Sequence, residues 1–218
     1  MNIHNTDDES RTQKDWFEYF KSKKERMISY LDILKLNESQ LVEVRKNFRG
    51  LRWEVTSSQV IYNSNGTTTI VHYADTNKPI KINIGELPVW RGTSISDVLN
   101  TKIGLEYFRA LHNDKKVKKE TIIKDLERIS EKPADKIDVW TALQDYRAGE
   151  PIRAVGLYFY WSRFDVDGSD RFVNVGCSHR VLSNSEPKAR SKKKTTKREL
   201  KILKEAKKII RKYDIQDF

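Results

Sequence analysis

Five cationic side chains near the end of the chain have the residue types and the spacing to bind a phosphate backbone. Lys197, Lys201, Lys204, Lys208 and Arg211 follow one another at intervals of four, three, four and three residues. In a helix this spacing places them about one turn apart along one face, where each can contact a phosphate and release counterions. The same pattern is also typical of the solvated face of a helix that packs against the rest of a protein.

The net charge of the chain is concentrated around these five residues. Residues 188–212 hold thirteen Lys and Arg against two Glu, and this excess of +11 equals the formal net charge of all 218 residues. A neutral body with one cationic segment is the electrostatic footprint of a protein that binds a polyanion. We therefore predict that DNA or RNA is the partner, with contacts from Lys192, Lys193, Lys194, Lys197, Arg198, Lys201, Lys204, Lys208 and Arg211.

Two tyrosines indicate a second candidate surface. Tyr158 and Tyr160 share one face of a predicted strand, and Arg180 lies on the predicted strand beside it. The other face of the tyrosine strand is apolar and predicted to be core: Val155, Leu157, Phe159 and Trp161. Tyrosines beside an arginine on a sheet suit the stacking of bases, so these three residues join the candidate contacts. The alternative is that helices cover this face and the tyrosines lie at the edge of the core.

Residues 165–170, Asp-Val-Asp-Gly-Ser-Asp, have a superficial likeness to a calcium-binding loop. The bidentate Glu that such a loop needs at its twelfth position is replaced by Gly176. We therefore expect no metal there and interpret the segment as the turn of a hairpin between strands 153–164 and 171–182. A loop of three or five residues is preferred, because it makes one face of the hairpin uniformly apolar.

The chain has no complete catalytic motif. Metal-dependent nucleases often combine an acid with Glu/Asp-x-Lys on an adjacent strand, but residues 199–201 and 205–207, which have that spacing, fall on the basic helix. The four histidines lack metal-ligand spacing, and no glycine-rich nucleotide motif is present, so no cofactor is expected. Polar residues of the first predicted sheet either converge into a site or are scattered over a solvated face: Glu54, His72, Asp75 and Lys81.

Three classes of function follow from these observations. The first is a nucleic-acid-binding protein that contacts phosphates through its basic C-terminal segment. The second is a nucleic-acid-processing enzyme, such as a restriction-type nuclease whose site departs from the usual pattern. The third is a viral or ribonucleoprotein structural component whose basic tail enters packaged nucleic acid. Cleavage of nucleic acid distinguishes the second class, and a stable homo-oligomer that forms without nucleic acid favours the third.

The composition predicts a folded core and a reducing compartment. Hydrophobic residues make up 37% of the 218 residues, and five are Trp, enough for one domain, either alone or with a smaller helical appendage. Cys177 is the only cysteine, so no intrachain disulfide can form, and a cytoplasmic setting is expected, or a nuclear one in a eukaryote. The sequence has no run of about 18 apolar residues, so no membrane span is predicted. The first nine residues are polar and acidic and differ from a signal peptide.

Hydrophobic periodicity predicts an α+β protein. We expect antiparallel β-hairpins, in one sheet or a partly open barrel, packed by helices and followed by a basic amphipathic C-terminal helix over 197–213. The core domain, with its N-terminal helices, covers 1–183, and the linker with the basic helix covers 184–218. Residues 85–101 are expected to be irregular or briefly helical. Helices are predicted over 16–34, from the cap Asn37 to about Gly50, and over 103–111, 119–130 and 135–146. Strands are predicted over 53–62, 67–74 and 80–84, with Asn65-Gly66 as a type I′ turn between the first two.

Overall fold

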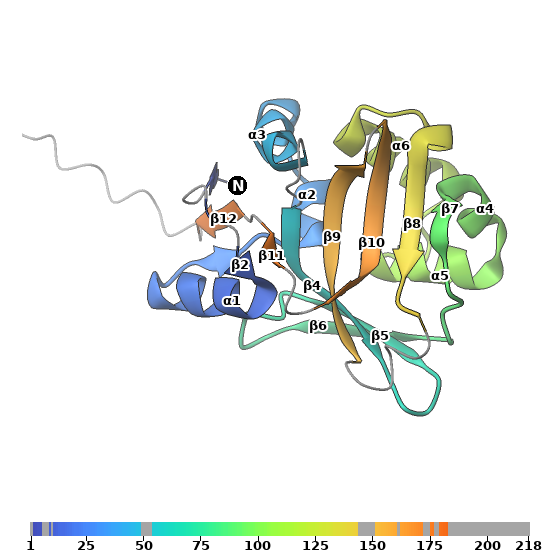
Figure 1. Ribbon diagram of the computed structural model, residues 1–218, viewed down its shortest axis with the longest axis horizontal. Helices are drawn as coiled ribbons and strands as arrows, with labels where there is room; N and C mark the ends of the chain where they lie inside the picture. The colour runs from blue at the N-terminus through green and yellow to red at the C-terminus, as the bar shows by residue number, and fades with distance from the viewer. Residues whose placement is uncertain are drawn as a thin grey trace, which may run out of the picture. The chain divides into compact units, whose positions relative to one another are not determined.

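A seven-stranded open sheet forms the centre of the computed structural model (Figure 1). The strand order is β6-β5-β4-β9-β10-β8-β7, and all neighbours are antiparallel except β8 and β10, which run parallel. The strands are β4 (Glu54–Tyr62), β5 (Thr68–His72), β6 (Ile80–Ile84), β7 (Arg91–Ser94), β8 (Ile137–Thr141), β9 (Ile152–Tyr160) and β10 (Arg163–Arg171). The prediction of an α+β protein is confirmed, and the sheet is open, with β6 and β7 at its edges.

The structure describes residues 2–5, 9, 11–48, 54–143, 151–160, 162–171, 175–176 and 179–182. All of them belong to one compact unit of the chain, Met1–Ser183. The predicted linker and basic helix of 184–218 lie outside the described residues, as do the nine candidate cations of that segment.

The helices are α1 (Gln13–Ser22), α2 (Tyr30–Leu34), α3 (Glu38–Phe48), α4 (Ile95–Asn100), α5 (Lys102–Leu111) and α6 (Lys119–Ser130). Helices α2 to α6 bury the main core against the sheet, whereas Trp16 and Phe20 of α1 pack in a separate cluster with Met27, Val55 and Ala154. Tyr107 and Phe108 of α5 are fully buried in the main core, together with Val155 and Leu157 of β9. In Figure 1, strands β9, β10 and β8 pass in front of α2, α5 and α6, so the face turned toward the viewer carries no helix at these strands. We call it the open face.

The meander of β4, β5 and β6 confirms the first predicted sheet, but its first turn differs from the prediction. Gly66 has a left-handed φ of +82°, whereas Asn65 does not, so the turn is not type I′. The Gly66 N–H donates to the Asn63 carbonyl (3.0 Å), and the Asn63 N–H donates to the Thr67 carbonyl (2.9 Å). The hairpin therefore closes with a three-residue loop that ends in a left-handed glycine.

The single helix predicted over 16–34 is wrong. Helix α1 ends at Ser22, Lys24 adopts a left-handed φ of +55°, and the short strand β3 (Arg26–Met27) follows. Ser29 then starts α2 with a capping box formed with Asp32. The predicted cap of α3 is confirmed, because the Gln40 N–H donates to the Asn37 side chain (3.1 Å) and the Asn37 N–H donates to the Gln40 side chain (3.1 Å).

The second predicted hairpin has a different turn. β9 and β10 pair around Tyr160 and Arg163, with Phe159 opposite Phe164, so residues 165–170 lie inside β10 instead of forming the turn. The predicted register is therefore wrong. Phe164 and Val166 face the main core and alternate with Asp165 and Asp167, which is the period of a strand.

The helix predicted over 135–146 is also wrong over its described part. A 3₁₀ turn (Ala134–Lys136) leads into β8, where Ile137 and Val139 enter the main core and alternate with Asp138 and Trp140. The segment of 85–101 contains β7 as well as the short helix α4. Short strands complete the structure: β1 (Asn2–Asn5) pairs with β12 (His179–Leu182), β12 pairs with β3, and β2 (Arg11–Thr12) pairs with β11 (Val175–Gly176).

Candidate functional site

Polar side chains of three adjacent strands gather on the open face. The sheet register places Asp165 of β10 between Asp138 of β8 and Tyr158 of β9, and it places Asp167 beside Trp140 of β8. With Arg163, these residues form what we call the open-face cluster: Asp138, Trp140, Tyr158, Arg163, Asp165 and Asp167. The strict alternation of apolar and polar residues in β8 and β10 positions the cluster, since it sends the apolar residues to the core and the others to the open face.

Asp138 and Arg163 form a bidentate ion pair inside the cluster. The Arg163 Nη2 donates to Asp138 Oδ1 (2.5 Å), and its Nε donates to Asp138 Oδ2. The Asp138 side chain is only 7% exposed, whereas that of Arg163 is 37% exposed. The ion pair raises the pKa of Arg163 and neutralises one of the three carboxylates on this face.

Asp165 is buried in the cluster without a donor comparable to Arg163. Its exposure is 2%, and burial is the main cause that raises its pKa to about 6. The negative charges of Asp138 and Asp167 raise it further, while Trp140 and Arg163 lower it. The Trp140 indole nitrogen lies near this carboxyl but, within the described part of the chain, makes no hydrogen bond of regular geometry. Asp165 is therefore a carboxyl group that titrates close to neutral pH.

Asp167 has donors of its own. Its Oδ1 accepts a hydrogen bond from the Ser169 backbone N–H (2.6 Å), and its Oδ2 accepts one from the Tyr158 hydroxyl (3.3 Å). Burial raises the pKa of Asp167, and the hydrogen bonds from Ser169 and Tyr158 oppose that rise. Tyr158 is thus held in place on the open face by a neighbouring strand.

The open-face cluster has the groups for proton transfer. A carboxyl group that titrates near neutral pH can both accept and donate a proton, and aromatic rings of Trp140 and Tyr158 lie on the same face. Among the described residues, no group of three or more His, Cys, Asp or Glu is arranged to hold a metal ion.

The three candidate contacts predicted on the second hairpin, Tyr158, Tyr160 and Arg180, do not all lie in one sheet. Tyr158 lies on the open face, opposite in parity to the core residues Val155 and Leu157, as expected. Tyr160 ends β9 opposite Arg163, and its side chain is outside the described residues. Arg180 lies on β12, paired with Met27 and His4, and therefore belongs to a different sheet from Tyr158. The expectation that Arg180 lies on the strand beside the tyrosines is wrong, because β10 takes that position.

The polar candidates of the first sheet do not form one open site, since Glu54 and His72 are buried, Asp75 is half-buried and Lys81 is exposed. His72 is fully buried, with Nδ1 3.0 Å from the Ser58 hydroxyl and Nε2 2.9 Å from the Ala110 carbonyl, and burial lowers its pKa. The Ser58 hydroxyl also accepts from the Tyr30 N–H (3.1 Å), so this buried Ser–His pair is structural. Asp75 accepts from the Met27 N–H (2.8 Å), and Lys81 is exposed on β6.

Sequence reasoning missed five of the six residues of the open-face cluster. The signal that could have found them is the period-two pattern of 137–141 and 164–167, which places Asp138, Asp165 and Asp167 on a common face once the two strands are neighbours. The turn-forming residue types of 165–170 instead favoured a hairpin turn there.

No protein-family model, no curated protein and no solved structure matches this chain. Among the described residues, no helix has both the length and the apolar character needed to cross a membrane.

Proposed function

We propose that this protein binds DNA or RNA and that residues 188–212 supply most of the phosphate contacts. The observation that carries the proposal is the charge distribution: this segment holds a net +11, and the rest of the chain is neutral. Lys197 to Tyr213 forms an amphipathic helix in this proposal, with its cations along one face. Because the single cysteine fits a reducing compartment, the proposed setting is the cytoplasm, or the nucleus in a eukaryote.

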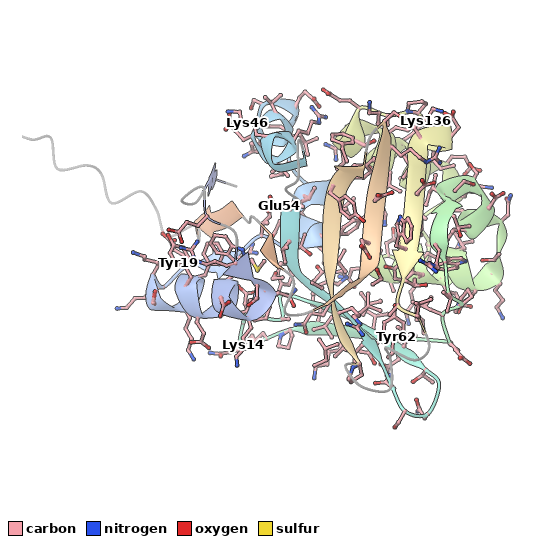
Figure 2. The ribbon with its side chains drawn as sticks, viewed as in Figure 1. Lys14, Tyr19, Lys46, Glu54, Tyr62 and Lys136 are labelled. Atoms are coloured by element: carbon pink, nitrogen blue, oxygen red, sulfur yellow. The ribbon has the colours of Figure 1, made fainter. Side chains whose placement is uncertain are left out.

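In this proposal, the described body attracts a polyanion more weakly than the C-terminal segment does. Three arginines of the body are paired with carboxylates: Arg26 with Asp32, Arg45 with Glu38, and Arg163 with Asp138. Three of the exposed lysines, Lys14 on α1, Lys46 on α3 and Lys136 before β8, lie well apart from one another (Figure 2). Dispersed and paired cations produce little net field at a distance.

The open face has a separate role in this proposal. Its carboxylates repel phosphates, but Tyr158 can stack on a base that is presented away from the backbone. Such a contact contributes about 1–3 kcal/mol per base. The body would therefore add base contacts to an affinity that comes mainly from the basic segment.

The decisive experiment compares two full-length variants that lose equal charge. In the first, Lys197, Lys201, Lys204, Lys208 and Arg211 are all replaced by Gln. In the matched control, five exposed lysines of the body are replaced by Gln: Lys14, Lys21, Lys35, Lys102 and Lys118. Binding to labelled single- and double-stranded DNA and RNA is measured by fluorescence anisotropy between 50 and 200 mM salt.

The basic-segment variant should lose affinity by about two orders of magnitude, and its salt slope on duplex DNA should become shallower by about 4 to 5 in log–log units if five phosphate contacts are lost. The control should lose much less. Equal losses of affinity in both variants would mean that the body contributes as much as the basic segment, or that affinity depends only on total charge. An unchanged affinity in the first variant would refute the proposal.

A second candidate function, cleavage of the bound nucleic acid, is favoured by one observation: the buried carboxyl of Asp165, whose pKa is about 6. Labelled RNA and DNA are incubated with the protein between pH 5 and 8, with and without Mg²⁺. Cleavage that disappears in Asp165→Asn while binding is retained would support an enzyme. Absence of cleavage by the wild type would exclude this candidate, and cleavage that persists in the variant would exclude Asp165 as the group that carries it.

A further inference from the structure

Two forked side chains of opposite hydrogen-bonding character lie next to each other on the open face. Arg163 and Asp165 are two positions apart on β10, so they point to the same side of the sheet. The guanidinium is a fork of N–H donors, and the carboxylate is a fork of two acceptor oxygens. A ligand that meets both forks must offer a pair of acceptors beside a pair of donors.

Asp138 engages one side of the Arg163 fork and leaves its end available. Asp138 accepts from Nε and Nη2 of Arg163, and no residue that the structure describes accepts from Nη1. The Arg163 side chain is 37% exposed. A guanidinium held from its side by a buried carboxylate keeps a fixed orientation, so one N–H of Nη1 and one of Nη2 point away from Asp138. These two parallel donors suit a pair of neighbouring acceptor atoms.

Asp165 supplies the acceptors of the second fork. It is recessed beside the half-buried Tyr158. Among the described side chains, the Trp140 indole lies near it as a donor but makes no hydrogen bond of regular geometry. A buried carboxylate without a good donor gains by accepting N–H groups from a ligand. Because Asp165 is recessed, a flat ligand that approaches with its edge suits the position.

The net charge of the open-face cluster restricts what the Arg163 fork can bind. Three carboxylates against one guanidinium leave the cluster negative, so it repels an anionic ligand such as a phosphate or a carboxylate. The acceptor pair of the ligand must therefore be neutral. Trp140 and Tyr158 on the same face favour a planar ring system.

Guanine is the nucleic-acid base that fits this description. It carries two neighbouring acceptors, O6 and N7, and two neighbouring donors, N1–H and the N2 amino group. Adenine and uracil alternate donors with acceptors along their edges. Cytosine has the neighbouring acceptors O2 and N3, but its donors belong to a single amino group. Guanine alone among the bases thus matches a donor fork and an acceptor fork at once.

We propose that the open face binds an unpaired guanine of the nucleic acid, with O6 and N7 accepting from Arg163 and with N1–H and N2–H donating to Asp165. This inference rests on the proposed nucleic-acid binding, because residues 188–212 hold the strand while the open face contacts one base. Asp138 is a positioning residue, since it fixes the guanidinium. The base must be unpaired because pairing with cytosine occupies N1–H and N2–H.

The test uses the full-length protein and labelled single strands of about twelve nucleotides, of thymidine in DNA and of uridine in RNA. One central base is changed to guanine, adenine, cytosine, hypoxanthine, which lacks the N2 amino group, or 7-deazaguanine, which lacks the N7 acceptor. Fluorescence anisotropy measures Kd at pH 8, well above the pKa of about 6 of Asp165, so that its carboxylate is ionised. A duplex with the same guanine opposite cytosine is the paired control.

Two protein variants with matched controls assign the contacts. Arg163→Lys keeps the charge and loses the fork, and Arg91→Lys at an exposed position of β7 is its control. Asp165→Asn keeps the shape of the side chain and loses one acceptor oxygen, and Asp114→Asn at an exposed position after α5 is its control. Circular dichroism melts check that all four variants fold.

We expect the single strand with guanine to bind about tenfold more tightly than those with adenine or cytosine. Hypoxanthine and 7-deazaguanine should each reduce this preference by at least about threefold, and pairing in the duplex should abolish it. Arg163→Lys and Asp165→Asn should lower the preference to less than about twofold, whereas both controls should keep it.

Equal affinity for all the single strands, with binding that still depends on the basic segment, would overturn this inference and leave the proposed function intact. A preference for cytosine would overturn it too, as would a guanine preference that either open-face variant retains. Absence of binding to every oligonucleotide would overturn both the inference and the proposed function.

Discussion

Asp165 is a buried carboxyl group whose environment disfavours its charged form. A carboxylate at 2% exposure ordinarily has an ion pair or several hydrogen-bond donors, and its neighbour Asp138 has Arg163. Asp165 instead lies between two other carboxyl groups, close to an indole nitrogen. Such an arrangement opposes folding at neutral pH, and strained electrostatics of this kind are common at functional sites.

Replacing this carboxyl should stabilise the protein in a pH-dependent way. The pKa of Asp165 is about 6 in the folded state, above its ordinary value of 3.8, so the folded state binds the proton more tightly than the unfolded state. The resulting destabilisation is absent below about pH 4, grows between pH 4 and 6, and is complete above pH 6. Allowing for solvent screening, Asp165→Asn should raise the free energy of unfolding by ~1–2 kcal/mol at pH 7 and by nothing at pH 4.

Urea unfolding of both proteins at several pH values between 4 and 8 checks this prediction. The exposed carboxyl of Asp135 provides the control, and Asp135→Asn should show no such pH-dependent gain. A destabilised Asp165→Asn variant at pH 7 would mean that the carboxylate makes favourable contacts that outweigh its burial.

Removing the guanidinium of Arg163 should act on both neighbouring carboxyl groups. Arg163→Gln leaves Asp138 buried without its bidentate partner, which should destabilise the protein by ~1–3 kcal/mol. It also removes the positive charge that lowers the pKa of Asp165, so that pKa should rise. Carbon-detected NMR titration of the Asp165 carboxyl measures the pKa directly, with Arg91→Gln on β7 as an exposed control. An unchanged pKa would show that Arg163 acts on Asp138 alone.

At the scale of secondary-structure elements, local signals predicted α3, α6 and the strands of the first meander well, but they failed for the strands with polar faces, β8 and β10. Helix α6 agrees with its predicted bounds, and the Asn37–Gln40 cap places α3, because both depend on nearby residues. The sequence of 165–170 is rich in turn-forming residues, yet it lies in a strand because Phe164 and Val166 are needed in the core. That choice is made by β8 and β9, which are distant in the sequence, and this tertiary effect overrides local propensity.

The candidate site illustrates the same limit. Tyr158 was placed on the correct face, since parity within one strand is a local property. Its neighbours Asp138 and Asp165 were not found as a pair, because a parallel pairing of β8 with β10 joins segments that are separated by β9. Nothing local to 135–141 indicates which strand will lie beside it.

Arg45 joins helix α3 to the end of α6 and should be essential to that contact. At 4% exposure, its Nε donates to the Ile129 carbonyl (2.9 Å), and its Nη1 donates to Glu38 (2.5 Å) and Glu131 (2.8 Å). Arg45→Met should destabilise the protein by ~2–4 kcal/mol, because it leaves the Ile129 and Arg128 carbonyls at the end of α6 without their donor. Thermal and urea unfolding measure the loss.

The adjacent Lys46 gives a matched control for this variant. Its exposed ion pair with Glu43 on the same helix contributes about 0.3–0.5 kcal/mol, so Lys46→Met should have little effect. If both variants lose the same small amount, Arg45 is not the link between α3 and α6.

At the scale of the whole molecule, charge and core are segregated along the chain. The main core is built from described residues between Ile28 and Val166, and the net charge is confined to 188–212. Folding of the body and electrostatic attraction of a polyanion therefore depend on different residues, so the two properties should be separable by mutation.

Ending the chain after Ser183 should remove nucleic-acid binding and retain the fold of the body. Because Met1–Ser183 is one compact unit with its own core, its circular dichroism spectrum should be that expected for a mixed helix and strand protein, with cooperative unfolding. Its affinity for nucleic acid should fall by orders of magnitude, and its salt dependence should become shallow, since about five to eight phosphate contacts are lost. A folded truncated chain that binds with the affinity and salt slope of the full-length protein would move the binding surface to the body, where Tyr158 and the open face would be the next residues to test.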